Sequence, residues 1–139
     1  MAYWIVINYE RNEYAIDLDR LSAFVCSPSG KITFWLPNSA FPIVLNKQSN
    51  PDAYQKVLDY IQQVSSFSLS GSWIQINYER EEYVIDLNRI GSFCHSPRGS
   101  LTFWLPDSAI PIIINEPTDS DTYHKILEFI KRKTGHHFP

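Results

Sequence analysis

Along most of the N-terminal half of the chain, large apolar side chains recur at every second position, so in an extended strand they would share one face. This is the pattern of half-buried β-strands. The alternation is clearest at Ile5, Ile7 and Tyr9, which recur at every second position. Polar and proline-containing stretches interrupt the alternation and indicate turns. The pattern predicts five strands, at residues 3–9, 13–18, 21–26, 32–36 and 41–45.

The first half of the chain is predicted to end with an edge strand and a helix. Residues 41–45 include Pro42, which has no backbone N–H to donate, so we expect this strand at a sheet edge. A helix should follow, because Asn50 is a capping residue and Pro51 suits the first helical position. The apolar stripe that we expect to cover the sheet consists of Tyr54, Val57, Leu58 and Ile61.

The sequence of the first half returns in the second half. Residues 4–11 read WIVINYER and residues 73–80 read WIQINYER, so the two stretches are offset by 69 positions. The same offset aligns residues 33–37 with residues 102–106, both of which read TFWLP. This internal repetition predicts a tandem duplication of one unit.

The offset predicts a second set of five strands and a helix. The strands are expected at residues 72–79, 82–87, 90–95, 100–105 and 110–114. The helix is expected to start near Ser120 and to close at Gly135, because glycine commonly ends helices. Its inward residues are predicted to be Tyr123, Ile126, Leu127 and Ile130.

The predicted fold class is α+β, a tandem duplication of a β-β-β-β-β-α unit with antiparallel sheets, each packed by one helix. Repeat 1 covers residues 1–64, a linker covers 65–71, and repeat 2 covers 72–139. A unit of about 70 residues buries only about 60% of its unfolded surface and is marginally stable alone. We therefore expect the two halves to share a core. The sequence leaves open whether they form one continuous sheet or two packed sheets.

Composition and charge argue against several classes of protein. Hydrophobic residues make up 44% of the 139 positions, which is typical of a folded domain. The 12 Lys and Arg residues and 15 Asp and Glu residues give a net charge of −3, which disfavours general binding to nucleic acids or anionic membranes. No apolar run approaches the roughly 20 residues that span a bilayer, and we expect a cytoplasmic protein.

The sequence carries no motif for catalysis or for cofactor binding. It contains no GxGxxG, GxxxxGK[ST] or GxSxG sequence. Cys26 and Cys94 are not equivalent under the 69-residue offset, and we expect both to be free thiols. The cysteines and histidines lack the spacing of metal ligands. We therefore expect no enzymatic activity, no cofactor and no metal site.

The strands carry a second face on which tryptophan and threonine recur. If the isoleucines of the strands turn toward the helices, this second face carries Trp4, Thr33, Trp35, Trp73, Thr102 and Trp104. These residues either form a core between the repeats or dock a partner. Because Gln75 stands where Val6 stands, we expect the face that carries Trp4 to be the less buried one. The hypothesis for function is a non-enzymatic protein-binding adaptor or regulatory module, acting as a monomer or homodimer through this face or through the edge strand.

Two alternative functions stay open. A small ligand would bind, or react, in a pocket between the repeats with polar groups from Tyr9, Asp17, Arg20, Tyr78, Asp86 and Arg89. Aspartates beside arginines are also typical of surface turns. The weaker alternative is local contact with nucleic acid through Arg98, Lys125, Lys131, Arg132 and Lys133.

Overall fold

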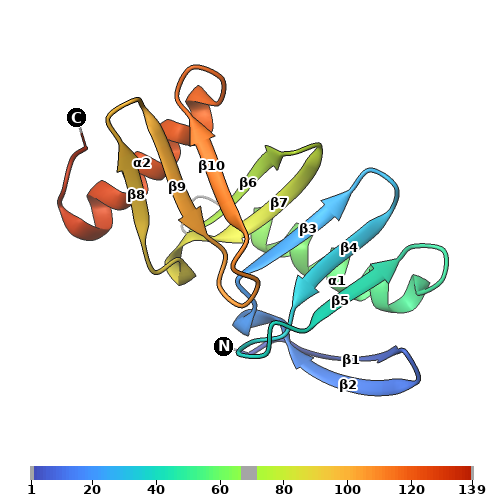
Figure 1. Cartoon of the computed structure of the whole chain (residues 1–139). Coiled ribbons are helices and arrows are strands. Elements are labelled where there is room, and N and C mark those ends of the chain that lie inside the picture. Colours follow the sequence, from blue (N-terminus) through green and yellow to red (C-terminus); the bar gives the residue numbers. More distant parts are fainter. Residues whose placement is uncertain (1, 67–71, 139) are drawn as a thin grey trace.

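The computed structural model describes residues 2–66, here called the N-terminal segment, and residues 72–138, here called the C-terminal segment (Figure 1). The N-terminal segment contains β1 (Trp4–Tyr9), β2 (Asn12–Asp17), η1 (Leu18–Arg20), β3 (Ala23–Ser27), β4 (Lys31–Trp35), β5 (Pro42–Asn46) and α1 (Pro51–Ser66). The C-terminal segment contains β6 (Trp73–Tyr78), β7 (Glu81–Asp86), η2 (Leu87–Arg89), β8 (Phe93–Ser96), β9 (Ser100–Trp104), β10 (Pro111–Asn115) and α2 (Ser120–Thr134). All strands and both α-helices lie close to their predicted ranges.

The strands form three antiparallel sheets, so the predicted α+β class is confirmed. The hairpin of β1 and β2 is a two-stranded sheet, and β10, β9 and β8 form a three-stranded sheet. The third sheet has five strands in the order β5-β4-β3-β7-β6, and it therefore combines strands of both segments. The expectation that each sheet is packed by its own helix needs correction, because the five-stranded sheet is common to both segments. The edge position predicted for residues 41–45 is confirmed, since β5 lies at one end of this sheet.

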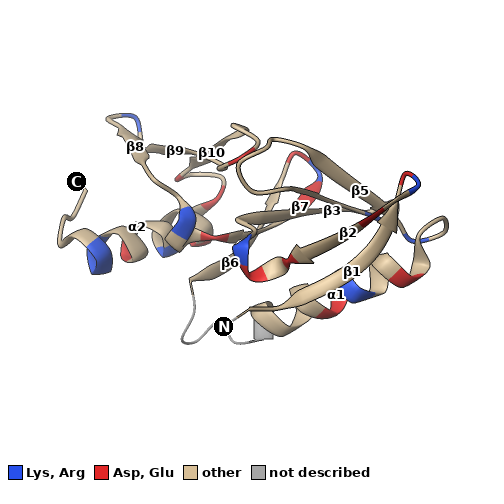
Figure 2. Ribbon diagram, turned by 90° about the horizontal axis from the view of Figure 1, so that it is seen from below, with Lys and Arg blue, Asp and Glu red and all other residues tan. Residues whose placement is uncertain are grey.

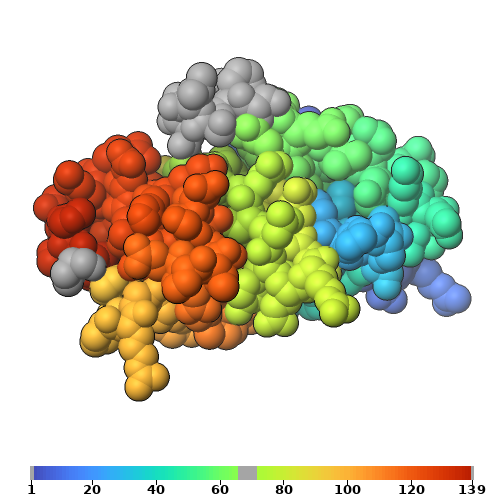
Figure 3. All heavy atoms as spheres, turned by 90° about the horizontal axis from the view of Figure 1, so that it is seen from above, coloured from blue at the N-terminus to red at the C-terminus, as the bar shows by residue number. Residues whose placement is uncertain are grey.

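The two segments are joined where β3 pairs with β7. The strands run antiparallel, with Phe24 opposite Val84 and Val25 opposite Tyr83. The backbone N–H of Asp86 extends the ladder by donating to the carbonyl of Ser22 at 2.9 Å. Figure 3 shows the yellow-green atoms of β6 and β7 between the blue and green atoms of the N-terminal segment and the orange atoms of the C-terminal segment. The hairpin of one segment thus completes the sheet of the other.

Both faces of the joined sheet contribute buried residues, and these residues belong to two separate cores. The N-terminal core consists of Ile5, Ile7, Ile16, Leu18, Leu21, Phe24, Ile32, Phe34, Ile43, Leu45, Ala53, Val57, Tyr60, Ile61 and Val84. The C-terminal core consists of Ala23, Val25, Ile76, Tyr83, Ile85, Leu87, Ile90, Leu101, Phe103, Leu105, Ile112, Ile114, Tyr123, Ile126, Phe129 and Ile130. Val84 therefore belongs to the core of the opposite segment, as do Ala23 and Val25. The halves share buried surface through these exchanged residues.

The helices pack on opposite ends of this arrangement, with α1 along the N-terminal hairpin and α2 beneath the three-stranded sheet (Figures 1 and 2). Helix α2 closes at Gly135, whose φ of 74° is in the left-handed region, as predicted. Its buried residues include Phe129, which the predicted stripe omitted. Helix α1 extends to Ser66, so the predicted linker starts too early, and residues 67–71 of that linker lie outside the described residues.

The start of α1 differs in detail from the predicted cap. Asn50 directly precedes the helix, and its carbonyl accepts a hydrogen bond from the backbone N–H of Tyr54 at 2.8 Å. Its side-chain oxygen accepts from the backbone N–H of Asn46 at 3.2 Å. Asn50 therefore ties the start of the helix to the end of β5. Among the described residues, no helix is both long and apolar enough to cross a bilayer.

Replacing Val84 with alanine should destabilise the whole chain. Val84 is fully buried in the N-terminal core although it belongs to the C-terminal segment. Loss of its methyl groups should lower the free energy of unfolding by about 2–3 kcal/mol, from lost burial and the cavity left behind. Urea denaturation followed by circular dichroism and by tryptophan fluorescence measures this change. Both probes should report one shared transition.

The matched control is Val6→Ala, on a strand of the same type. Val6 is 48% exposed, so this change should alter the free energy of unfolding by no more than about 0.5 kcal/mol. An unaltered stability in the Val84→Ala variant, or two separate transitions of which only one shifts, would show that the segments do not share a core.

Candidate binding surfaces

The four tryptophans occupy two kinds of environment. Trp35 and Trp73 are partly buried at the junction between the segments. Trp4 and Trp104 are 64% and 44% exposed. The 69-residue offset relates Trp4 to Trp73 and Trp35 to Trp104. Each pair of equivalent residues therefore contains one covered and one open indole.

The covered tryptophans pack on the core of the opposite segment. The Trp73 ring stacks on Phe24 with a centroid distance of 6.0 Å and meets the edge of Tyr60 at 6.3 Å. Trp35 packs against the C-terminal core. The interpretation of the tryptophans as a core between the halves thus fits Trp35 and Trp73. Thr33 and Thr102 are partly buried on the same sheet faces as Trp35 and Trp104.

The open tryptophans lie on two outer faces of the molecule. The N-terminal outer face is the side of the β1–β2 hairpin that carries Trp4, Val6 and Ala15, all exposed. The C-terminal outer face is the side of the three-stranded sheet that carries Cys94, Trp104 and Ile113, also exposed. The expectation that the Trp4 face is the less buried one is confirmed.

Each outer face is bordered by a strand with one unpaired edge. In the described part of the chain, β2 pairs only with β1, and β8 pairs only with β9. The free edge of such a strand presents backbone N–H and C=O groups that another strand can use. In Figure 1, β8 lies at the left of the molecule and β2 at the lower right, so the two edges are at opposite ends.

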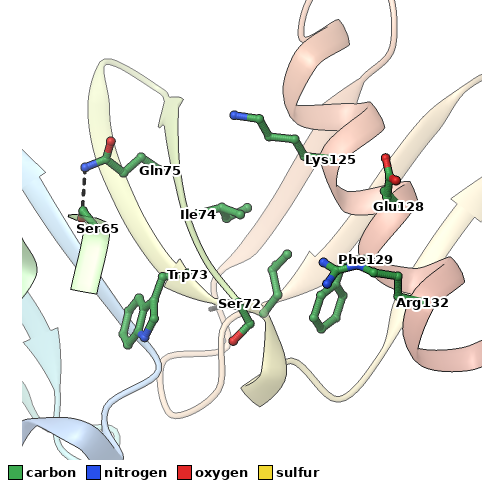
Figure 4. Close-up of a pocket in the computed structure, with 10 residues that line it drawn as sticks. Ser65, Ser72, Trp73, Ile74, Gln75, Lys125, Glu128, Phe129 and Arg132 are labelled. Atoms are coloured by element: carbon green, nitrogen blue, oxygen red, sulfur yellow. Dashed lines mark hydrogen bonds between the residues drawn. The ribbon is translucent and has the colours of Figure 1, made fainter. Parts of the chain in front are cut away.

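A hollow of about 400 Å³ lies between β6 and α2 (Figure 4). Its lining includes Ser72 and Phe129 together with the charged residues Lys125, Glu128 and Arg132. Ser72 stands where Tyr3 stands in the N-terminal segment, and the Tyr3 ring packs edge-on against Tyr60 at 4.9 Å. The small serine leaves the equivalent space beside Phe129 open. The absence of this ring contributes to the hollow.

None of the six polar residues predicted for a ligand pocket lines the hollow between β6 and α2 or either of two further pockets among the described residues. Asp17 and Asp86 instead cap the two 3-10 helices, each accepting from the backbone N–H two positions later at 3.1 Å. Arg89 pairs with Asp86 at 3.5 Å and donates to the carbonyl of Asp19. These contacts are those of structured turns.

The remaining predicted ligand residues lie at the surface or between strands. Arg20 is exposed, and the hydroxyl of Tyr9 accepts a hydrogen bond from the backbone N–H of Val44 at 3.2 Å. Tyr78 packs edge-on against Tyr83 with a centroid distance of 5.8 Å. Tyr9 therefore ties the N-terminal hairpin to the edge strand β5.

Asp19 is held by groups from both segments. The Tyr60 hydroxyl donates to its carboxylate at 2.6 Å, and Arg89 donates to its carbonyl. Burial, with the hydrogen bond to Asp19 as a second cause, raises the pKa of the Tyr60 hydroxyl well above its usual value. This hydroxyl therefore stays protonated and acts as a fixed donor at the junction.

The thiols and imidazoles form no metal site in the part of the chain that the structure describes. Cys26 and Cys94 are both free thiols. Burial, and next the charge of Glu82, raise the pKa of the Cys26 thiol to about 11, so little thiolate forms near neutral pH. The His95 ring contacts the Tyr123 hydroxyl at 2.9 Å and stacks on Phe138. These contacts fix the imidazole in packing.

The predicted basic residues do not form one surface of uniform charge. Lys125 and Arg132 line the hollow together with Glu128. The side chains of Arg132 and Lys133 both lie 5.9 Å from the centroid of the Phe129 ring, and Lys131 is exposed in the same last turn of α2. Arg98 lies apart from them, between β8 and β9. Figure 2 shows acidic residues interspersed among the basic ones along the molecule.

Comparisons of the chain with protein-family models, with curated proteins and with solved structures found no match in any of the three.

Acrylamide should distinguish the two kinds of tryptophan. In four variants that each keep one tryptophan and carry phenylalanine at the other three positions, fluorescence quenching reports the exposure of the one retained. Dilute samples should show strong quenching of Trp4 and Trp104 and weak quenching of Trp35 and Trp73, because only the last two are covered by the other segment. Equal quenching within either equivalent pair would contradict the two environments.

Proposed function

We propose that the chain is a non-enzymatic protein-binding module that engages other polypeptides through its two outer faces and the free edges of β2 and β8. The observation that carries this proposal is the contrast between Trp4, which is 64% exposed, and Trp73, which packs on Phe24 and Tyr60. We also infer that the chain arose by tandem duplication of a unit with five strands and one helix. The recurrence of the order of elements supports this inference.

Exposed indoles on the face of a sheet are well suited to bind another protein. Tryptophan buries a large area and is enriched among the residues that dominate binding energy. Within this chain, the junction between the segments shows how the same residue type is covered when a partner surface is present. The outer faces offer that chemistry without an intramolecular cover.

The free strand edges supply the second part of the proposed binding mode. An extended polypeptide can add to an open edge through main-chain hydrogen bonds, while side chains on alternate positions select the partner. At β8, Cys94 is exposed and Phe93 is partly buried, so an added strand would contact both faces of the sheet. At β2, Ala15 is exposed on the same face of the hairpin as Trp4.

Site-specific photocrosslinking tests the proposed function. A benzophenone amino acid placed at position 15 or 94 lies on an outer face beside a free edge, and one placed at position 55 lies on the exposed side of α1. Irradiation in an extract of the source cells should give discrete protein adducts from positions 15 and 94, identified by mass spectrometry. Position 55 is the matched control and should give none above background.

Adducts that are absent at positions 15 and 94, or that match those from position 55, would contradict the proposed function. A folded state is required of every variant, and circular dichroism with thermal unfolding establishes it before irradiation.

A further inference from the structure

We infer that the partner for these edges is a second copy of this chain, which adds its β2 to β8 of the first copy in a head-to-tail assembly. This inference rests on the proposed function and names the partner of the same surfaces. It follows from the way in which the chain already joins its own two segments.

The number of strands in each sheet points to this arrangement. The shared sheet has five strands because the three-stranded unit β5-β4-β3 receives the hairpin of β7 and β6. The chain also contains a three-stranded sheet, β10-β9-β8, and a two-stranded sheet, β1-β2. Under the 69-residue offset these are the equivalents of the two parts of the shared sheet. Together they would form a second sheet of five strands.

A single chain cannot make this second joint, because β2 and β8 lie at opposite ends of the molecule (Figure 1). Two chains can. The β3–β7 ladder supplies the register: Phe24 faces Val84 and Val25 faces Tyr83. Shifted by 69 positions, these pairs place Phe93 opposite Ala15 of the second copy, and Cys94 opposite Tyr14 of the second copy.

The transferred register also matches polar groups. Cys26 faces Glu82 in the shared sheet, and the equivalent pair is His95 with Glu13 of the second copy. An imidazole opposite a carboxylate is a favourable cross-strand pair. The contact of Arg89 with the Asp19 carbonyl has its equivalent in Arg20 of the second copy with the carbonyl of Asn88. Arg20 is exposed in the single chain and therefore available.

A preformed hollow exists for the indole of the second copy. It measures about 360 Å³ and is lined by Phe93 and Phe129, among other residues. The equivalents of these two aromatic residues are Phe24 and Tyr60, which are the residues that contact Trp73. Trp4 is the equivalent of Trp73, so Trp4 of the second copy would fill this hollow. The C-terminal segment thus has the receptor for an indole that the N-terminal segment presents.

Trp104 would be covered in the same event. Its equivalent, Trp35, packs on the core of the following segment, and the β8–β10 sheet of one copy would lay Trp104 on the N-terminal core of the next. Tyr14 packs against that core, and its ring stacks on Phe41 with a centroid distance of 6.3 Å. Phe41 is 42% exposed in the single chain.

The contact joins two different surfaces, so it is heterologous. Such an interface closes into a ring when the rotation between copies permits, and otherwise continues as a filament. Either product leaves fewer free strand edges than the single chain has. Val6 would stay exposed, because its equivalent, Gln75, is exposed on β6 at the edge of the shared sheet.

Disulfide trapping of the purified full chain tests the register. In a Cys26→Ser background, Tyr14→Cys should form an intermolecular disulfide with the native Cys94, because directly opposed antiparallel residues lie within bonding range of a disulfide. Mild oxidation should give dimers and higher species on a non-reducing gel. Glu13→Cys is the control, since its side chain points to the other face of the strand, and it should react at least about tenfold more slowly.

Analytical ultracentrifugation gives a second readout that needs no cysteine. The unmodified chain should sediment as larger species as its concentration rises. Trp4→Ala should remove this association while it leaves the thermal unfolding temperature of the monomer unchanged, and Gln55→Ala, on the exposed side of α1, should associate like the unmodified chain. Equal trapping at positions 13 and 14, or a chain that stays monomeric at every concentration, would overturn the inference.

The two proposals fail in different ways. If the purified chain stays monomeric while positions 15 and 94 crosslink to a different protein in the extract, the partner is not a second copy and the binding module stands. If neither experiment gives a product, both proposals are wrong. Adducts that contain only this chain, together with trapping at position 14, support both.

Discussion

The antiparallel pairing of β3 with β7 is the interaction on which the rest of the structure depends. It places Phe24 and Val84 on the α1 side of the sheet and Val25 and Ile85 on the α2 side, so that one ladder contributes to both cores. Removing either segment would take residues out of the core that remains, and it would expose the edge and the one face of β3 or β7 that the other segment covers. Segments of this size are marginal as independent units. Their interdependence is therefore the source of a stable fold.

The same joint explains why equivalent residues meet different surroundings. A single joint covers one tryptophan of each equivalent pair and leaves Trp4 and Trp104 exposed on the two outer faces. The free edges of β2 and β8 are chemically matched, because β2 is the counterpart of β7 and β8 is the counterpart of β3. Folding within the chain and association between chains would then rest on the same strand pairing and the same aromatic contacts. Binding between chains would then use the same type of contact that joins the two segments within one chain.

The strands, the helices and the faces of the strands could be predicted from local sequence. Which strands pair with one another across the two segments could not. Alternation at Ile5 and Ile7 fixes which side chains share a face, and Pro42 predicts an edge, since both effects act within a strand. Alternation does not specify which strand lies alongside, so the exchange of the β6–β7 hairpin was not predicted. Trp4 and Trp73 begin nearly identical stretches, WIVINYER and WIQINYER, and they differ in exposure only because residues distant in the sequence cover one of them.

Amide hydrogen exchange of the dilute monomer tests the central joint most directly. The interdependence of the segments predicts that the paired amides of β3 and β7 exchange only through global unfolding. They should share one free energy of opening, equal to that from denaturation, and amides at the free edges of β2 and β8 should exchange faster. Exchange of the β3 and β7 amides at a much lower free energy, with each segment still protected elsewhere, would show that the segments fold independently and would contradict this account.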